Sequence, residues 1–495
     1  MKRPKHPWCL LVCVLLGVTS VSSAADTLVS DNVPPFSGQP SAEGAASSAR
    51  PRIASSSSST NDDTLHAVWQ DFEDGEWGIF YARSIDAGQA WSTPLRLSQA
   101  GRNATDPTIV TNGEDLVYVA WHAFERGPSG HQEFIRFSAS FDNGASGIFF
   151  PIDVNLEEAT PPTQYATAPQ ISAASDDVHV TWTQENAARD GDDVFVWSMS
   201  TGSIPFKTNL YRFQGLSFPA KPRVETTGDR NVYLAFLEDD GTASERDPYL
   251  SHALAPWASD SWSAPAEVPG NAGLGANEPE KGNASELRMD AFPGGLVVVG
   301  WVENRQTYGY VNYSIDAGQS WASATLFHQG SADPGDILGD VYDFDMALAP
   351  VSPPVIGFSY GVVTASGLDQ YGTLVDGAGN VTPQVIGSAV PGSQVLPRTS
   401  LCEAGGELHV AWIGGAGQAP TSFEDIYSAG WALGSGWSTA TLVNDAPGVA
   451  RSASPDVTAF PSSSQAHVVF DDRRNFQPPP ANGPDGATEI YHAAP

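Results

Sequence analysis

Cysteine is scarce in this 495-residue sequence, which contains only three. Two of them, Cys9 and Cys13, fall in an N-terminal segment that resembles a signal peptide, so Cys402 is expected to be alone in the mature chain. One cysteine cannot form an intramolecular disulfide, so the fold must be held by its hydrophobic core. We expect Cys402 itself to be a small apolar residue buried in a strand.

Positive charge is also scarce. The chain has 24 lysines and arginines against 57 aspartates and glutamates, which gives a formal net charge of −33. So acidic a surface repels nucleic acid and anionic membranes, and we exclude both as partners. It is compatible with cationic partners or with Ca²⁺, but charge alone establishes neither, and no cofactor is expected.

Long apolar runs are missing, and no stretch is long enough for a good transmembrane segment. Basic residues within 1–5 precede a short apolar stretch at 9–18 and small residues at 22–24. This is the pattern of a secretory signal peptide over 1–24, with the mature chain starting near Ala25. We therefore expect a secreted protein, either extracellular or periplasmic.

Turn formers and aromatics are abundant, with 48 glycines, 38 prolines, 14 tryptophans and 14 tyrosines, while charged residues make up only 16%. This composition is typical of an all-β protein with many short strands. One apolar strand closed by an aromatic residue, first seen at 65–69, recurs along the whole chain. Its eight copies lie at 65–69, 117–121, 178–182, 232–236, 297–301, 354–358, 408–412 and 466–470.

A repeat of this length with strand-type patterning indicates about four strands per unit, as in the blades of a β-propeller. The sequence therefore predicts one propeller domain over 25–495 with eight four-stranded blades, or seven as the alternative. The eighth repeat ends after three strands, and residues 27–31 resemble the fourth strand of the seventh repeat at 441–445. We expect 25–33 to complete the last blade and close the ring, and 34–50 to form a loop to the first blade.

A motif of the form S-x-D-x-G-x-x-W occurs twice, where a third strand should turn into a fourth. A weaker copy at 140–144 lacks the tryptophan. We expect Asp to accept hydrogen bonds from the turn, Gly to take a positive φ, and Trp to pack into the blade core. The residues of the two full copies are Ser84, Asp86, Gly88 and Trp91, and Ser314, Asp316, Gly318 and Trp321.

This motif is similar to the Asp-box, or BNR repeat, and through it the chain resembles the sialidase-like propeller superfamily. The resemblance implies a propeller fold, with the Asp-box turns on the face opposite the substrate site. It does not imply one activity, because the same repeats occur in sialidases, other glycosidases, and non-catalytic binding proteins.

Arginines recur at one position of the innermost strand of each repeat. Arg52, Arg223, Arg288 and Arg398 share it, with Asp345 and Asp456 in two other repeats. Four guanidinium groups at one level of a channel could grip a carboxylate or sulfate. The alternative is a salt-bridge lattice in which the aspartates neutralise the arginines.

Acidic residues recur two positions beyond the strand-closing aromatic. This predicted acidic rim could supply a general acid, a Ca²⁺ site or a cation-binding edge, or it could consist of solvated turns. Its members are Asp71, Glu238, Glu303 and Asp472. Histidines at another shared strand position, His66 among them, are expected to fill blade interfaces rather than bind metal.

The family resemblance implies candidate catalytic residues for a sialidase-like hydrolase. Asp74 stands where the family's acid lies, and Tyr342 could correspond to its tyrosine nucleophile. No glutamate matches convincingly, and the family's catalytic propellers have six blades. The favoured interpretation is a non-catalytic module that binds a glycan or an extracellular protein, with a glycosidase acting on acidic glycans as the alternative.

Overall fold

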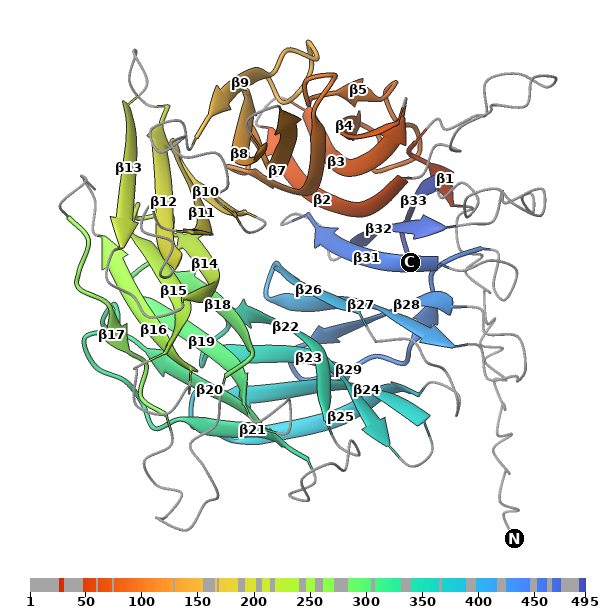
Figure 1. The fold of residues 1–495 in the computed structure, drawn as a ribbon. Coiled ribbons are helices and arrows are strands. Elements are labelled where there is room, and N and C mark those ends of the chain that lie inside the picture. Colours follow the sequence, from red (N-terminus) through yellow and green to blue (C-terminus); the bar gives the residue numbers. More distant parts are fainter. Residues whose placement is uncertain are drawn as a thin grey trace, which may run out of the picture.

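Eight antiparallel sheets follow one another along the chain in the computed structural model. Figure 1 shows them standing around a common centre, with colours that run once round the ring. The first blade, in orange, therefore lies beside the last blade, in blue. The predicted all-β propeller is confirmed with eight blades rather than seven.

The structure describes 21 segments of the chain. They are residues 26–30, 48–58, 61–73, 75–127, 130–154, 165–166, 169–185, 192–201, 207–213, 219–239, 246–253, 261–270, 284–303, 308–330, 340–364, 367–388, 398–415, 424–445, 452–460, 465–472 and 489–495. The predicted signal peptide lies outside them, and they contain no helix long and apolar enough to span a membrane.

The strands of each blade follow one another from the innermost strand outward. Blades 1 to 4 are β2 (Ser48–Ser58), β3 (Asn61–Glu73), β4 (Glu76–Ser84) and β5 (Leu95–Arg96); β6 (Asn103–Thr111), β7 (Val117–Gly127), β8 (Gly130–Ser140) and β9 (Phe150–Asp153); β10 (Gln170–Ala174), β11 (Asp177–Glu185), β12 (Asp192–Ser200) and β13 (Lys207–Phe213); β14 (Ala220–Thr226), β15 (Val232–Asp239), β16 (Arg246–Ala253) and β17 (Ala266–Glu267).

Blade 7 has a fourth strand in two pieces, which both pair with its third strand. Blades 5 to 8 are β18 (Glu286–Phe292), β19 (Leu296–Glu303), β20 (Tyr308–Ser314) and β21 (Thr325–Gln329); β22 (Val341–Ala349), β23 (Val355–Thr364), β24 (Gly367–Asp376) and β25 (Val381–Ser388); β26 (Thr399–Ala404), β27 (Glu407–Gly415), β28 (Glu424–Ala432), β29 (Gly436–Trp437) and β30 (Thr441–Leu442); β31 (Ser452–Ala459), β32 (Ala466–Asp472), β33 (Glu489–Ala493) and the N-terminal β1 (Thr27–Leu28).

The ring closes as predicted, because β1 pairs antiparallel with β33. Beyond β1, the N–H of Val29 donates to the carbonyl of Ile490 at 2.9 Å, and the Ser30 hydroxyl accepts from the Ile490 N–H at 2.9 Å. Blade 7 repeats this arrangement, with Val443 and Asn444 taking the places of Val29 and Ser30. The N-terminal segment is therefore a full structural replacement for a fourth strand, and it pairs the edge of β33.

The prolines that open the innermost strands belong to β-bulges in four blades. The residue before each proline is left-handed, with φ between 49° and 54°, and the bulge lies opposite the strand-closing aromatic. Proline fits there because it has no N–H to contribute to the ladder. The left-handed residues are Arg50, Asp106, Lys221 and Ser454.

Blade 6 carries the same bulge without a proline, at Asp343. The aromatic opposite this bulge is Tyr360, so the predicted repeat strand at 354–358 is placed two residues too early. The sequence pattern pointed to Phe358 as the closing aromatic because Phe358 and Tyr360 are both fully buried on the same side of β23. The correction leaves Asp345 at the position that the arginines hold in other blades.

The hydrophobic core is divided among the blade interfaces. One cluster joins Leu250 of blade 4 to Trp301 of blade 5, and another joins Trp69 of blade 1 to Ile490 of blade 8. Each sheet is thus covered on both faces by its neighbours, which explains why the middle strands are apolar throughout.

The Asp-box turns form as the motif predicts. The Ser84 hydroxyl donates to Asp86 Oδ1 at 2.7 Å and accepts from the Gly88 N–H at 2.8 Å. Asp86 Oδ1 also accepts from the Ala90 N–H at 2.9 Å, and Gly88 has a φ of 86°. The residue before the glycine is left-handed too, which the motif did not predict.

The two box tryptophans lie between blades rather than inside their own. Trp91 is half-buried against the cluster that joins blades 8 and 1, and Trp321 against the cluster that joins blades 4 and 5. Backbone bonds link the box turns to the turns between first and second strands, such as the Ala317 N–H to the Gly295 carbonyl at 2.9 Å. Both kinds of turn therefore lie on one face of the ring, which we call the box face.

Candidate functional site

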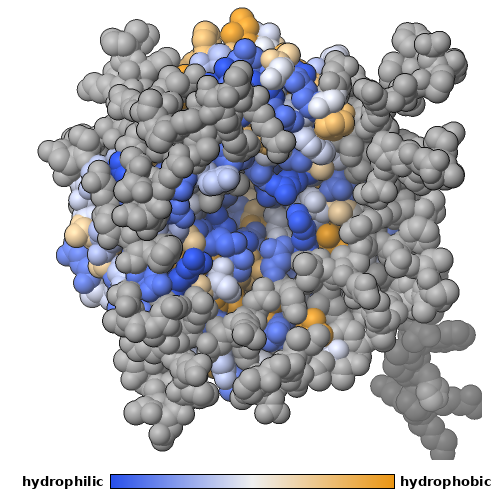
Figure 2. Space-filling model, viewed as in Figure 1, coloured by the Kyte–Doolittle hydropathy of each residue, from blue (hydrophilic) through white to orange (hydrophobic). Residues whose placement is uncertain are grey.

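The channel wall is built by the innermost strands, and one side chain from each blade forms a ring around it. Figure 2 shows the hollow at the centre of the molecule, with mainly hydrophilic residues around it where the surface is coloured. We define the channel ring by strand register. In each blade, its member is the residue of the innermost strand that pairs with the position just before the closing aromatic of the second strand. Its members are Arg52, Thr108, Gln170, Arg223, Arg288, Asp345, Ser400 and Asp456.

Arg398 is not a member of this ring, contrary to prediction. Its carbonyl accepts from the N–H of Ile413, which places it two residues before Ser400. Blade 7 has no bulge in its described residues, so the proline pattern gave the wrong register there. Arg398 is still near the channel, because its charge lowers the pKa of Arg50, after the larger effect of burial.

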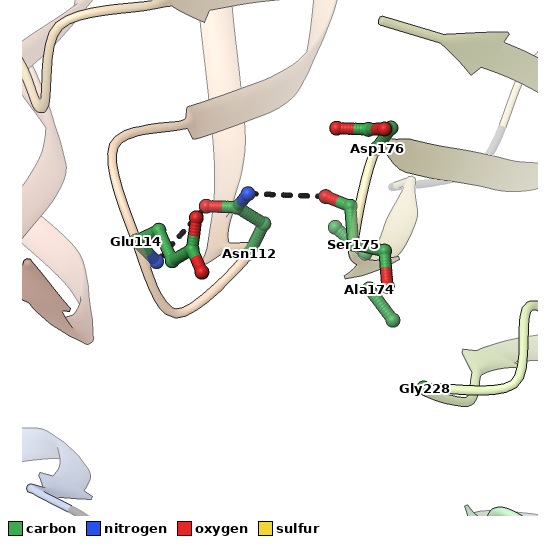
Figure 3. Close-up of a pocket in the computed structure, with 7 residues that line it drawn as sticks. Asn112, Glu114, Ala174, Ser175, Asp176 and Gly228 are labelled. Carbon is green, nitrogen blue, oxygen red and sulfur yellow. Dashed lines mark hydrogen bonds between the residues drawn. The ribbon is translucent and has the colours of Figure 1, made fainter. Parts of the chain in front are cut away.

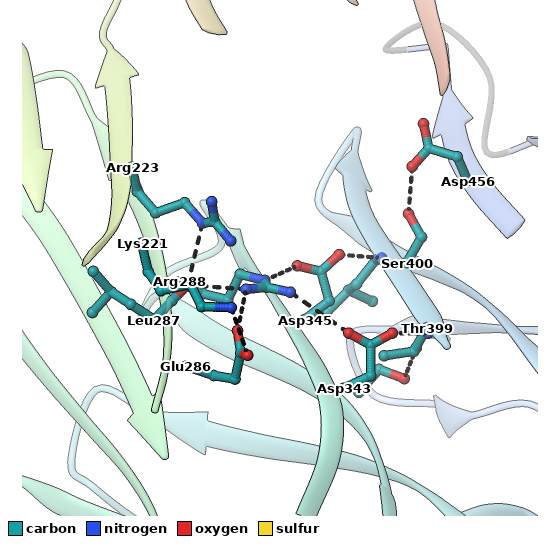
Figure 4. A network of polar contacts seen from close by, with 12 residues as sticks. Lys221, Arg223, Glu286, Leu287, Arg288, Asp343, Asp345, Thr399, Ser400 and Asp456 are labelled. Atoms are coloured by element: carbon teal, nitrogen blue, oxygen red, sulfur yellow. Dashed lines mark hydrogen bonds and ion pairs between the residues drawn. The ribbon is translucent and has the colours of Figure 1, made fainter. Parts of the chain in front are cut away.

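Five ring members lock one blade to the next. Their side chains reach the free edge of the following innermost strand or the ring residue that it carries. Figure 4 shows this for Arg223, which reaches Leu287, and for Arg288, which reaches Asp345. An edge strand has unpaired backbone groups, and these contacts satisfy some of them. The contacts are Arg223 Nε to the Leu287 carbonyl (3.2 Å), Arg288 Nε to Asp345 Oδ1 (3.0 Å), the Leu401 N–H to Asp345 Oδ2 (2.9 Å), the Val457 N–H to Ser400 Oγ (3.2 Å) and the Ile53 N–H to Asp456 Oδ2 (2.8 Å).

Arg288 belongs to a salt-bridge lattice. Besides Asp345, its guanidinium lies 3.8 Å from Asp343 Oδ1 and 3.7 Å from Glu286 Oε2. Burial alone would lower the pKa of Arg288, but these carboxylates raise it. Its charge is therefore neutralised inside the protein.

Arg52 and Arg223 differ from Arg288. Within the described residues neither forms an ion pair, and their terminal nitrogens donate to the preceding proline carbonyls, each at 3.3 Å. Burial, together with the charge of Arg288, lowers the pKa of Arg223 to about 9, and Arg52 contributes to the same shift. The charges of Glu286 and Asp345 partly oppose this shift, but neither carboxylate forms an ion pair with Arg223.

Asp456 does not neutralise Arg52 by direct contact. Both of its carboxylate oxygens are occupied, by the Ile53 N–H at 2.8 Å and by the Ser400 hydroxyl at 2.9 Å. Burial raises the pKa of Asp456 while the charge of Arg52 lowers it, so the two groups are neighbours without a hydrogen bond between them. The lattice interpretation thus describes Arg288, whereas Arg52 and Arg223 form no direct ion pair among the described residues.

A second level of the channel contains two carboxyl groups. Glu225 and Asp290 lie two residues beyond Arg223 and Arg288 on the same faces of β14 and β18. Burial and the charge of Asp290 raise the pKa of Glu225, while Asp290 accepts from the Leu348 N–H at 2.8 Å.

The predicted acidic rim is wrong as a surface feature. Asp71, Glu238 and Asp472 are 2%, 7% and 1% exposed, because they follow the closing aromatic on the same face of the strand and pack between blades. Asp71 accepts from the Ser48 hydroxyl at 3.1 Å, and Glu303 accepts from the indole N–H of Trp301 at 2.7 Å. Burial of Asp71, Glu238 and Asp472 between the blades therefore excludes an exposed acidic rim at these three positions.

The structure describes neither of the side chains that the sialidase resemblance suggests as catalytic. Asp74 lies outside the described residues. Tyr342 pairs through its backbone with Gly361 at the start of β22, and its side chain is not among those that the structure describes. Across the described part of the chain, no three side chains of the metal-binding types are grouped to hold an ion.

A separate hollow of about 500 Å³ lies among the turns between first and second strands of blades 2, 3 and 4. Figure 3 shows Asn112 reaching across it to the Ser175 carbonyl, at 3.0 Å. The Asn112 carbonyl oxygen accepts from the Glu114 N–H at 3.0 Å, so its amide is already engaged. The hollow has no arginine in its wall, and its charged side chains, Glu114 and Asp176, are acidic.

The fold defines the class of protein as an eight-bladed β-propeller. No model of a known family matches the sequence, and no curated protein matches it. Solved structures do resemble it in fold, and three examples follow. A Trypanosoma rangeli sialidase in complex with sialic acid has 10% identity and a TM-score of 0.39, covering 81% of this chain and 55% of the sialidase.

The second is a puromycin hydrolase, with 12% identity and a TM-score of 0.46, covering 85% of this chain and 58% of the hydrolase. The third is an ulvan lyase of polysaccharide lyase family PL25, with 12% identity and a TM-score of 0.39, covering 61% of this chain and 77% of the lyase. The chain thus spans little more than half the length of the sialidase. Likenesses this distant carry no conclusion on activity or ligand.

Proposed function

We propose that this chain is a binding module that holds the carboxylate or sulfate group of an acidic glycan in its central channel. One observation carries the proposal: Arg52 and Arg223 face the channel without an ion pair among the described residues, while Arg288 beside them has three carboxylates within 4 Å. A guanidinium without a carboxylate partner of its own can bind a carboxylate or sulfate by charge-assisted hydrogen bonds.

The shape of the site favours a glycan over a folded protein. The arginines belong to the innermost strands of their blades, at the channel wall rather than on the outer surface of the ring. A stable protein interface needs about 800 Å² from each partner. A strongly acidic exterior, with a net charge of −33, also repels long polyanions and favours a ligand with one acidic group.

The proposal is tested by calorimetry at low salt, with glucuronate and with sialylated and sulfated oligosaccharides as ligands. Arg52→Gln and Arg223→Gln should each weaken binding about tenfold or more, since a hydrogen bond to a charged group contributes about 1.5–3 kcal/mol. Neutral oligosaccharides should not bind. Arg83→Gln is the matched control, because the Arg83 guanidinium also donates to a backbone carbonyl, that of Asn143 at 3.0 Å, but on the box face.

The proposal would be contradicted if Arg83→Gln weakened binding as much as the channel variants do. It would also be contradicted if acidic protein ligands bound while every acidic glycan failed to bind. Turnover is measured on the same panel. Cleavage that disappears in Asp74→Asn and Tyr342→Phe would show a glycosidase instead of a pure binding module.

A further inference from the structure

The channel ring is divided into a locked half and an open half. Every junction from blade 4 round to blade 1 is bridged at ring level by the five contacts described above. No ring-level bridge joins the described residues of blades 1 to 2, 2 to 3 or 3 to 4. The ring residues at these three junctions are Arg52, Thr108 and Gln170.

These three junctions are bridged at other levels of the same strands. The Thr111 hydroxyl donates to the Ser55 carbonyl at 2.6 Å, and the Asn112 amide donates to the Ser175 carbonyl at 3.0 Å. The Ser172 hydroxyl accepts from the Thr226 N–H at 2.9 Å. Because the blades are already joined there, the ring side chains of this half are not required for closure.

Two neutral side chains therefore lie between the two arginines of the site. Thr108 is half-buried, and its hydroxyl has no hydrogen-bond partner in the described part of the chain. The Gln170 amide makes one bond, from Nε2 to the Pro169 carbonyl at 3.0 Å, which leaves its oxygen and a second N–H for other partners. The order around the open half is Arg52, Thr108, Gln170 and Arg223, one from each of four consecutive blades.

We propose that Thr108 and Gln170 determine specificity by hydrogen-bonding hydroxyl groups of a ligand whose acid group lies on Arg52 and Arg223. The inference rests on the proposed function and narrows its ligand to an acid that carries neighbouring hydroxyls. A hydroxyl and an amide can both donate and accept, as a sugar hydroxyl does. A site that binds hydroxyls rejects an analogue without them, because its own polar groups then lose water without gaining a partner.

The test compares glucuronate with cyclohexanecarboxylate, two acids built on six-membered rings, of which only the first has hydroxyls. Thr108→Val and Gln170→Leu, made in the full mature chain, should each weaken glucuronate about three- to tenfold, the effect of one or two neutral hydrogen bonds. Both should leave the affinity for cyclohexanecarboxylate unchanged. Thr382→Val, at an exposed site on the outermost strand of blade 6, is the matched control and should change neither.

The outcomes separate the two proposals. If Arg52→Gln and Arg223→Gln weaken both acids but the Thr108 and Gln170 variants act on neither, or on both alike, the specificity inference is wrong and the anion site stands. If the arginine variants bind both acids as the parent does, both proposals are wrong. If the parent binds neither acid, the specificity inference is wrong, and binding of the sialylated and sulfated oligosaccharides then decides the proposed function. Unfolding midpoints equal to the parent's exclude loss of the fold as the cause of weaker binding.

Discussion

Gly88 of the first Asp-box turn lies directly against the imidazole of His492, on the last strand before the C-terminus. A methyl group on Gly88 would overlap the ring atoms of His492. Trp91 adds to this contact, with its ring 5.6 Å from that of His492 in an edge-to-face arrangement. The box turn of blade 1 is thus part of the seam where the ring closes.

The same arrangement recurs at the other box turns, which gives the glycine two separate requirements. Gly144 lies against Tyr81 of the preceding blade, and a Cβ on Gly318 would lie 2.6 Å from Leu250 of the preceding blade. Each glycine also has φ between 68° and 86°. The motif therefore needs glycine both for its left-handed backbone and for close packing against the sheet of the preceding blade.

Gly88→Ala should destabilise the protein more than the backbone alone explains. A left-handed non-glycine residue costs about 1 kcal/mol, and displacement of the His492 ring adds to it, for a total of about 2–4 kcal/mol. Gly101→Ala is the matched control, because Gly101 has the same φ of 86° and nothing within 4 Å of its Cβ position. Urea unfolding of both variants measures the difference, and equal midpoints would show that the His492 contact does not contribute.

The two roles within the channel ring should separate in stability measurements. Arg288→Gln leaves Asp345 and Asp343 without their cation and should lower the free energy of unfolding by about 2 kcal/mol. Arg52→Gln removes a side chain that bonds only to its neighbour's carbonyl and should change stability by less than about 0.5 kcal/mol. The opposite order in urea unfolding would mean that Arg52 is the structural residue.

Repeat spacing was enough to predict the eight blades and the role of the N-terminal strand, because each blade must bury both faces against its neighbours. Register within a blade was harder. Phe358 and Tyr360 are both fully buried aromatics on the same side of the strand, so only the bulge opposite Tyr360 distinguishes them. In blade 7, Arg398 was assigned to the ring, but the strand register places Ser400 there.

The site was predicted in part. Arg52, Arg223 and Arg288 do share one level of the channel, but their partners come from other blades and depend on side-chain direction, which a repeat alignment cannot give. The prediction of an acidic rim was wrong because the position two residues after the closing aromatic can lie either in an exposed loop or in a buried interface between blades. The buried bond from Trp301 to Glu303 could have been anticipated from their i, i+2 spacing on a strand.

The N-terminal strand should matter as much as an internal one. Val29 is 3% exposed and Val443 2%, at equivalent places in blades 8 and 7. Val29→Ala and Val443→Ala should each lower the free energy of unfolding by about 1.5 kcal/mol, the transfer free energy of two buried carbon groups. Thermal unfolding of the two variants checks this, and a silent Val29→Ala would mean that the ring does not depend on its closing strand.

Acid should destabilise the protein through its buried histidines. His179 is fully buried, its Nδ1 lies 2.7 Å from the Ser198 hydroxyl, and burial lowers its pKa to about 4. Between pH 6.5 and about 4 the unfolded chain binds a proton there that the folded chain does not, so this contribution falls as the pH falls. His179→Asn should therefore be less stable than the parent at pH 7. This difference in the free energy of unfolding should shrink toward pH 5, by up to about 1.4 kcal/mol per pH unit. A difference that is constant with pH in urea unfolding would show that His179 titrates normally.

Glu225 should change the free energy of unfolding in the opposite direction over an overlapping pH range. Its side chain accepts from the Ser172 hydroxyl at 3.1 Å, and burial together with the charge of Asp290 raises its pKa. Above a pH of about 4.3 the unfolded chain releases this proton while the folded chain retains it, so the stabilisation is present at low pH and is lost as the pH rises. Glu225→Gln removes the titration and keeps an acceptor for Ser172, so the variant should gain stability relative to the parent between pH 5 and pH 8. Urea midpoints of both proteins at these pH values measure the gain. If the parent instead becomes more stable relative to the variant as the pH rises, Glu225 is a charged partner of Arg223 and not a protonated acid.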